Sequence, residues 1–326
     1  MSTLTTRTPP GPVAGGSHKT TPDRPVRRGR FNTKAALARW SLIVPAAVVI
    51  IPLLVIIVVQ GFQLVTHNES LLRPGSGDVW VGWDNFVRAF QDPTLLGSIR
   101  VTLIYVVAGV AFEMVIGVGI AVLLNGRMPG KGVLRALILI PMVLTPVVAG
   151  LMWRLLLDPT SGFVNYLLGL LGLGDNHAFL SDPATALPAV IMVEIWQNTP
   201  FVIIIVLAGL EALDPSPFEA AQLDGAHGWK LLRHVTLPML APVLSIVLLL
   251  RIIDAVKTFA LVNTMTKGGP GTSTLAISNY VYRVGFETFD IGYATTVGFL
   301  VSVAVLIILF PTATRLMGLR IRKARR

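Results

Sequence analysis

Residues 211–242 read EALDPSPFEAAQLDGAHGWKLLRHVTLPMLAP and form the longest polar interruption between two long apolar runs in the second half of the chain. The stretch predicts a helix, a turn and a second helical segment. Ser216, Pro217 and Glu219 have the spacing of a capping box, so a short helix is expected to begin at Pro217. Gly225 is expected to end this helix, because glycine enters the left-handed conformation without a steric penalty.

A second amphipathic segment follows the predicted turn. Trp229, Leu232 and Val235 recur at helical spacing. Pro238 and Pro242 then mark the start of the next long apolar run. The predicted short helix therefore stands between two apolar runs and outside both of them.

The composition places the chain among membrane proteins. Of its 326 residues 53% are hydrophobic and 13% are charged, and the mean hydropathy is +0.71. A soluble domain of this size needs more polar surface. The net charge of +10 could indicate a nucleic-acid partner. However, the basic residues lie at the ends of apolar runs, where the positive-inside rule places them, so no nucleic-acid partner is expected.

Six apolar runs predict an all-α polytopic membrane protein with both termini in the cytoplasm. The six-span domain is expected at residues 41–316, after a disordered basic tail at 1–40 and before a basic cytoplasmic C-terminus at 317–326. No cleavage site follows the first run, which predicts an uncleaved anchor. The expected spans are 41–65, 101–124, 134–157, 186–210, 240–262 and 291–314.

Three external segments are expected between these spans. The first, 66–97, carries aromatic residues suited to the membrane surface. The second, 158–184, contains no Lys or Arg and predicts a short surface or re-entrant helix at about 163–171. The third begins with a glycine-rich turn and predicts a half-buried helix at 276–286.

The central stretch resembles the EAA loop of permease subunits in binding-protein-dependent ABC importers. The residues that carry the resemblance are Glu219-Ala220-Ala221-Gln222-Leu223-Asp224-Gly225-Ala226, then Leu237-Pro238 and Pro242. The Asp-Gly-Ala and Leu-Pro elements are most similar to the carbohydrate-uptake branch, of the maltose and glycerol-phosphate type. Residues 81–86 and the Gly-Gly-Pro at 268–270 also resemble elements of that family.

The resemblance implies the type I ABC importer permease fold, with six transmembrane helices and a cytoplasmic coupling helix within residues 211–236. It implies a bacterial plasma-membrane transporter subunit, not an enzyme. The implied partners are a second homologous permease subunit, a dimer of cytoplasmic ATPase subunits, an extracytoplasmic solute-binding protein, membrane lipid and a carbohydrate-like substrate. ATP and Mg²⁺ would bind the ATPase, and this chain would bind no cofactor. The solute could be an oligosaccharide, a polyol or a glycerol phosphate.

The resemblance also implies the contact with the ATPase. The implied coupling residues are Glu219, Ala220, Ala221, Asp224, Gly225 and Ala226. The alanines are small enough for close approach, and Glu219 or Asp224 could meet a basic group. A purely structural role remains open, in which Glu219 caps its own helix and Asp224 assists the turn.

Charged side chains within the spans need an explanation, because each costs about 2.5 to 3.5 kcal/mol at the centre of a membrane helix. Arg251, Asp254 and Lys257 are three residues apart and could form a ladder of ion pairs on one helical face. Such a ladder could pack helices together or line a translocation path. Glu113 has no partner that the sequence indicates.

A polar and aromatic cluster precedes Pro200 in the fourth span. Planar polar groups beside an aromatic face are suited to carbohydrates, although the same groups also hold membrane helices together. No metal site is expected. The candidate residues of a substrate path are Glu194, Trp196, Gln197, Asn198, Asp254 and Lys257.

Two other classes of protein fit the sequence less well. A secondary transporter of small polar solutes, driven by an ion gradient, would be expected to show matching halves with broken helices, and none stands out. An intramembrane enzyme would need a nucleophile or a metal set within its spans. His227 and His234 lie in the polar stretch instead.

Overall fold

The computed structural model describes residues 33–67, 80–126, 129–174 and 176–323. Within these ranges the secondary structure is helical, apart from one isolated β-bridge between His67 and Trp80. Five helices are long and apolar enough to cross a membrane, or six if one bent pair of helices counts as a span. The predicted class, an all-α polytopic membrane protein, is confirmed.

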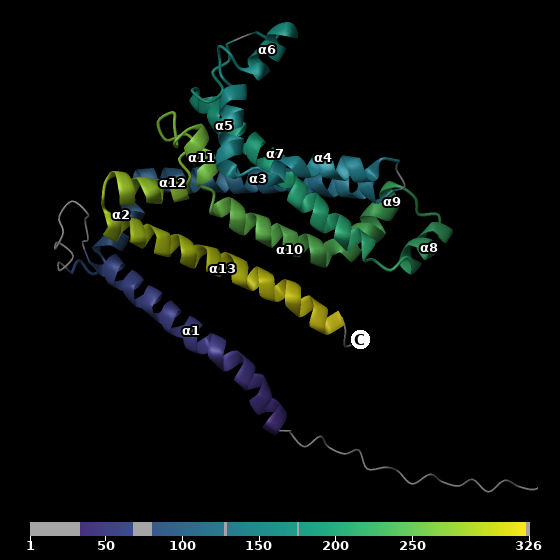
Figure 1. Ribbon diagram of the computed structural model, residues 1–326, viewed down its shortest axis with the longest axis horizontal. Coiled ribbons are helices and arrows are strands. Elements are labelled where there is room, and N and C mark those ends of the chain that lie inside the picture. The colour runs from purple at the N-terminus through teal and green to yellow at the C-terminus, as the bar shows by residue number, and fades with distance from the viewer. Residues whose placement is uncertain (1–32, 68–79, 127–128, 175, 324–326) are drawn as a thin grey trace, which may run out of the picture. The chain divides into compact units, whose positions relative to one another are not determined.

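Figure 1 shows the order of these elements along the chain. The long helices are α1 (Thr33–Thr66), α3 (Pro93–Asn125), α4 (Lys131–Val143), α5 (Pro146–Leu156), α7 (Pro183–Glu211), α10 (Leu237–Val256) and α13 (Ile291–Lys323). The short ones are α2 (Asp84–Gln91), α6 (Phe163–Leu170), α8 (Ser216–Leu223), α9 (Trp229–Leu231), α11 (Ala260–Met265), α12 (Ile277–Tyr282) and two π-helical turns, η2 (Leu232–Thr236) and η3 (Arg283–Glu287).

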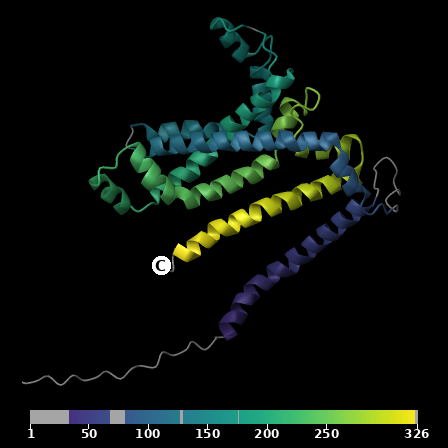
Figure 2. The same cartoon turned by 180° about the vertical axis from the view of Figure 1, so that it is seen from behind.

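The chain divides into two compact units, residues 1–56 and 57–326. In the second unit α3 and α7 pack together, and α4 and α10 contact this pair; Figures 1 and 2 show these helices side by side. A Cβ atom at Gly117 of α3 would lie 2.7 Å from the side chain of Val202 on α7. Only glycine therefore permits this approach of the two backbones, as small residues do between membrane helices.

Two helices begin earlier than the spans that the sequence predicted, although the described apolar stretch of the first runs from Ala47 to Thr66. α1 begins at Thr33, not at 41, while residues 1–32 of the expected tail lie outside the described residues. α3 begins at Pro93, not at 101. The Asp92 carboxylate accepts hydrogen bonds from the backbone N–H groups of Thr94 and Leu95 at 2.8 and 3.2 Å, which caps the helix directly before its proline.

The expected third span, 134–157, is not one helix. α4 and α5 meet at an angle of 95°. Pro146 lacks an N–H group and disfavours helical geometry at Thr145, which is extended and caps α5 by accepting the N–H of Val148 at 3.4 Å. A pair of prolines, at 141 and 146, therefore breaks a run whose hydropathy is continuous.

The fifth span also ends before its predicted boundary of 262. α10 stops at Val256, and α11 begins four residues later. Side chains of α12 satisfy the carbonyl groups at this break: Ser278 donates to Val256 O and Asn279 donates to Phe259 O, both at 3.3 Å. The predicted external helix at 276–286 is present as α12 and η3.

The other predicted elements agree more closely with the structure. α7 matches the fourth span within three residues, and α6 matches the short helix expected near 163–171. α13 begins at Ile291 as predicted but continues to Lys323, beyond the expected end at 314. The last three residues of the basic C-terminus lie outside the described residues.

Candidate functional site

The central loop, residues 211–236, contains α8, but the predicted capping box does not form. Pro215 already has helical dihedral angles (φ −69°, ψ −24°), so Ser216 lies inside the helix and cannot adopt the extended conformation of a cap. The Asp214 carboxylate instead accepts the N–H of Ser216 at 3.0 Å. The role of helix cap expected for Ser216 is therefore wrong.

The C-terminal end of α8 agrees with the prediction. Gly225 has a positive φ of +81°. Its N–H donates to Gln222 O at 3.0 Å, and the N–H of Ala226 donates to Ala221 O at 2.8 Å. This pair of hydrogen bonds is a Schellman motif, which requires a left-handed residue at the position of Gly225. It closes the helix and fixes the direction in which the chain leaves it.

α8 has no buried residue and presents a mixed surface. Glu219, Ala220 and Asp224 are exposed, whereas Ala221 and Ala226 are half-buried. Leu223 and, beyond the turn, Trp229 are 90% and 69% exposed. Large apolar side chains in such positions are typical of a surface that another protein covers.

Ion pairs at the start of the central loop connect it to α4. The Glu211 carboxylate, in the last turn of α7, lies 2.5 Å from an Arg135 nitrogen and 4.0 Å from Lys131 Nζ. These groups are partly exposed, so each pair stabilises the contact only weakly. The sequence identified Lys131 and Arg135 as markers of a cytoplasmic loop but gave no sign that they approach Glu211, 76 residues away from Arg135.

A charged cluster lies buried among α3, α7 and α10. Arg251 donates from Nε to Glu113 Oε2 at 2.6 Å and from Nη2 to Glu113 Oε1 at 3.1 Å. The same Nη2 donates to Glu194 Oε1 at 2.8 Å. The side chains of Arg251 and Glu113 are 3% and 0% exposed. The bidentate pair joins α10 to α3, and the bond to Glu194 joins α10 to α7, so this buried cluster connects three membrane helices.

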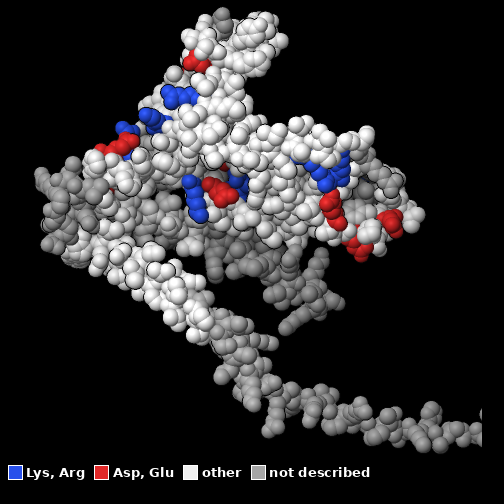
Figure 3. Space-filling model, in the orientation of Figure 1, with Lys and Arg blue, Asp and Glu red and all other residues white. Residues whose placement is uncertain are grey.

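The predicted ladder of Arg251, Asp254 and Lys257 forms only in part. Asp254 lies 3.6 Å from Arg251 but leaves 61% of its side chain exposed. Asp254 and Lys257 are both fully described, and no ion pair joins them. Figure 3 shows acidic and basic side chains gathered in a hollow, with further charged groups elsewhere on the same face. Arg251 thus forms its stronger pairs with helices distant in sequence.

The polar cluster on α7 is also engaged with protein groups. Gln197 donates to Leu144 O at 2.9 Å and so satisfies a carbonyl that the break between α4 and α5 leaves free. Asn198 donates to Glu194 O at 3.3 Å. Trp196 packs edge-on against Trp153, with ring centroids 5.5 Å apart. These contacts give each side chain a structural role, and a contact with substrate remains a prediction.

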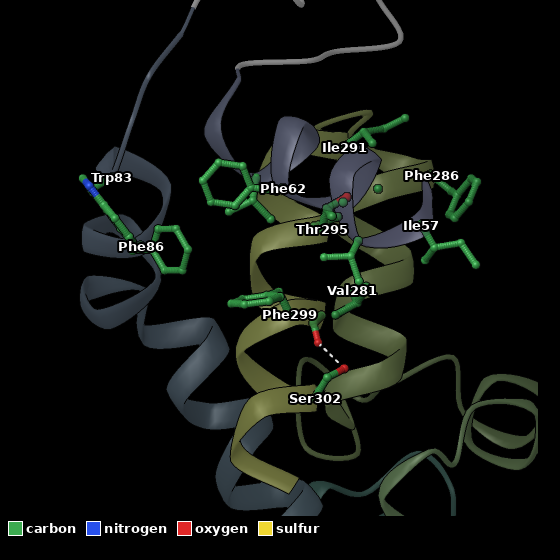
Figure 4. Close-up of a pocket in the computed structure, with 16 residues that line it drawn as sticks. Ile57, Phe62, Trp83, Phe86, Val281, Phe286, Ile291, Thr295, Phe299 and Ser302 are labelled. Atoms are coloured by element: carbon green, nitrogen blue, oxygen red, sulfur yellow. Dashed lines mark hydrogen bonds between the residues drawn. The ribbon is translucent and has the colours of Figure 1, made fainter. Parts of the chain in front are cut away.

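An apolar cavity lies away from this charged cluster. It has a volume of about 780 Å³ and is lined by the last turns of α1 together with α2, η3 and α13. Figure 4 shows Phe62, Phe86 and Phe299 around it, and the one hydrogen bond drawn joins Ser302 to Gly298 O at 2.8 Å. No charged residue lines the cavity, and Thr295 and Ser302 are among its few polar side chains, so the lining is mainly apolar.

Comparison with known proteins gives a consistent result. Residues 113–323 match the family model described as binding-protein-dependent transport system inner membrane component. A probable ABC transporter permease of Sinorhizobium fredii is 40% identical over 289 residues, 89% of this chain and 93% of the relative. The trehalose/maltose transport system permease protein MalF of Thermococcus litoralis is 33% identical over 277 residues, 85% and 92% of the two chains.

The fold has a solved counterpart. A crystal structure of a bacterial alginate ABC transporter, in complex with an alginate pentasaccharide-bound periplasmic protein, contains a chain that matches with a TM-score of 0.71. The match covers 86% of this chain and 93% of that one at 23% identity, which shows a common fold. The family model and the 40% identical relative show membership of a family as well as a common fold. The chain therefore belongs to the family of inner membrane components of binding-protein-dependent transport systems.

Proposed function

We propose that this chain is a permease subunit of an ATP-driven carbohydrate importer and forms half of its translocation path. The observation that carries the proposal is the central loop, where an exposed helix of the family's loop pattern is closed by a Schellman motif. A sugar substrate is supported by the trehalose/maltose permease among the relatives. The substrate class is an oligosaccharide, a polyol or a glycerol phosphate.

The other half of the path is a second homologous permease subunit. A dimer of cytoplasmic ATPase subunits binds ATP and Mg²⁺ and carries out the hydrolysis, while an extracytoplasmic solute-binding protein delivers the substrate. The periplasmic protein bound to the alginate transporter supports the last of these partners. Both termini lie in the cytoplasm, and the plasma membrane is bacterial.

The ATPase contact is formed by Glu219, Ala220, Ala221, Asp224, Gly225 and Ala226 of the central loop. The small side chains and the 90% exposed Leu223 fit a groove in the partner. The loop connects α7 with α10, and Arg251 of α10 is bonded to Glu194 of α7 within the membrane. A displacement of α8 would therefore move both helices as one body.

The substrate path is lined by exposed groups on the inner side of this body. Asp254 and Lys257 are exposed at the end of α10, and Trp196 and Asn198 are half-buried on α7. Glu194 and Gln197 are buried and would act by holding the wall in place. ATP binding closes the ATPase dimer, so the coupling loops of the two permease subunits move together and the path opens to the outside. Hydrolysis of ATP then returns the path to its inward-facing state.

The experiment is ATPase activity of the reconstituted complex with and without binding protein and candidate sugars. Glu219→Ala and Gly225→Pro are compared with wild type, with Gln222→Ala as an exposed control on the same helix. We expect one solute with binding protein to stimulate hydrolysis, and both loop variants, but not the control, to lose this stimulation in assembled complexes. Solute uptake by the chain alone, driven by an ion gradient, would instead establish a secondary transporter.

A further inference from the structure

α6 exposes a stripe of large apolar side chains on the external side of the protein. Phe163, Tyr166, Leu167 and Leu170 follow the spacing of one helical face. Their exposed fractions are 57%, 63%, 41% and 67%. Leu171 and Leu173, which are 72% and 63% exposed, extend the same apolar character beyond the helix. These four side chains are named here the α6 stripe.

The opposite face of α6 is firmly held. The Asn165 amide is 3% exposed and donates to Asp158 O at 2.9 Å and to His177 O at 3.1 Å. Its oxygen accepts the N–H of His177 at 2.9 Å. Three hydrogen bonds on one buried side chain fix the rotation of α6 about its axis. The α6 stripe therefore has a defined direction.

A polar turn precedes α6. The Asp158 carboxylate accepts the backbone N–H groups of Ser161 and Thr160 at 2.9 and 3.0 Å, as well as both hydroxyl groups. These hydrogen bonds, with that from the N–H of Ser161 the strongest, lower the pKa of Asp158 to about 2. The carboxylate remains ionised at physiological pH, so this turn must stay in contact with water or lipid headgroups.

The helix before this turn is apolar too. α5 exposes Val147, Val148, Leu151 and Leu155. Figures 1 and 2 show α6 at the far end of α5, away from α3, α7 and α10. Figure 3 shows charged side chains on this arm as well, and the sequence places Arg154 in the last turn of α5 and Asp158 in the turn before α6, both outside the α6 stripe. The α6 stripe thus prolongs an apolar surface that begins within the broken span.

The chemistry of the α6 stripe indicates what covers it. A protein that docks and leaves would expose these side chains to water in every cycle, and such interfaces carry charged groups at their rims. Residues 158–184 contain no Lys or Arg, and their three acids, Asp158, Asp175 and Asp182, lie outside α6. Packing against another membrane helix favours small residues. Gly169, the only glycine of α6, falls outside the stripe.

We propose that α6 is inserted into the outer leaflet of the bilayer. Phe163, Leu167 and Leu170 lie among the acyl chains, and the Tyr166 hydroxyl reaches the headgroups, where amphipathic aromatic residues are favoured. The insertion holds the external end of the broken span at the membrane surface. The choice of the outer leaflet rests on the proposed cytoplasmic position of both termini, whereas the insertion itself does not depend on the proposed contact between the central loop and an ATPase.

Site-directed spin labelling tests the insertion directly. The chain has no native cysteine, so a single cysteine is labelled without background. Leu167→Cys and Leu170→Cys report on the stripe, and Ala184→Cys, in the exposed first turn of α7, is the matched control. The full complex is measured in lipid nanodiscs, with and without binding protein, after uptake assays show that each labelled variant still transports.

The readout is the ratio of accessibilities to oxygen, which partitions into lipid, and to a water-soluble nickel chelate. The ratio of oxygen accessibility to nickel accessibility is expected to be at least several-fold higher for labels at Leu167 and Leu170 than for the label at Ala184, whether or not binding protein is present. Nickel contact equal to that of the Ala184 label would overturn the proposal. So would shielding from both reagents, which marks burial in a protein, or shielding that appears only with binding protein.

Discussion

α8 and α6 are both helices of eight residues that stand outside the membrane spans, yet their surfaces differ in kind. α8 combines one acid and two alanines with a single large exposed leucine, whereas four of the eight residues of α6 form an apolar stripe. Both helices are fixed at their ends or on one face by specific hydrogen bonds. This difference underlies the two proposals, a groove in a partner protein for α8 and lipid for α6.

Arg251 of α10 is bonded to α3 and to α7, and α7 is the long helix between α6 and α8 along the chain. Arg251→Leu leaves Glu113 and Glu194 buried without their cation, which is expected to cost about 3–5 kcal/mol. We expect a large loss of folded protein in thermal unfolding assays in detergent. Asp254→Asn, which changes a largely exposed partner, is the control and should change stability little. Equal effects of the two variants would contradict a central role for Arg251.

The connection to α6 runs through the break between α4 and α5. Gln197→Leu keeps the size of the side chain but removes the donor to Leu144 O. Because Leu144 is half-buried, the loss is expected to lie at the lower end of the about 1–3 kcal/mol that an unsatisfied buried carbonyl costs. The variant should unfold at a lower temperature. Spin labels at Leu167 should also become more mobile, because the break anchors the segment that leads to α6. Unchanged label mobility would separate α6 from the break.

The two surfaces should respond differently to added bulk. Ala220→Trp places a large ring on exposed α8 and is expected to lower binding-protein-stimulated ATPase activity at least about tenfold, equivalent to about 1.4 kcal/mol. Leu167→Trp replaces one large apolar side chain of α6 with another and should leave that activity unchanged. Thermal stability is expected to stay constant in both. Loss of activity in the second variant alone would reverse the assignment of the two surfaces.

The smallest effect is expected where the central loop begins. Glu211→Gln removes the partner of Arg135 and Lys131, a partly exposed contact of about 0–1 kcal/mol. Stimulated ATPase activity should fall modestly at low ionic strength and match wild type at high salt, where such pairs are screened. A deficit that persists in high salt would show that Glu211 acts through more than its charge.

The features that the sequence predicted were those encoded locally. Six apolar runs gave the class of the protein, and Gly225 gave the end of α8 because a left-handed residue has few substitutes. The bend between α4 and α5 was missed, since hydropathy remains high through Pro141 and Pro146. The predicted cap at Ser216 was also wrong, because Pro215 already adopts helical dihedral angles and Ser216 lies inside the helix.

The buried cluster could not be predicted for a different reason. Arg251 meets Glu113 from 138 residues away, and only the packing of α3 against α7 and α10 brings them together. The sequence predicted that Arg251 pairs with Asp254, three residues away on the same helix. That ion pair is longer and more exposed than the pair between Arg251 and Glu113. A single sequence shows which residues share a face of one helix, but it does not show which residues of other helices that face contacts.

The break after α4 has a consequence for the surrounding bilayer. A helix of 13 residues rises about 20 Å, whereas the hydrocarbon layer is about 30 Å thick. If α4 crosses the hydrocarbon layer without α5, its length falls short of the layer's thickness, and local thinning of the bilayer would accommodate the difference. Transport rates in bilayers of increasing acyl-chain length should consequently pass through a maximum at short chains. The lipid composition of the cell then becomes one of the variables that set the rate of uptake.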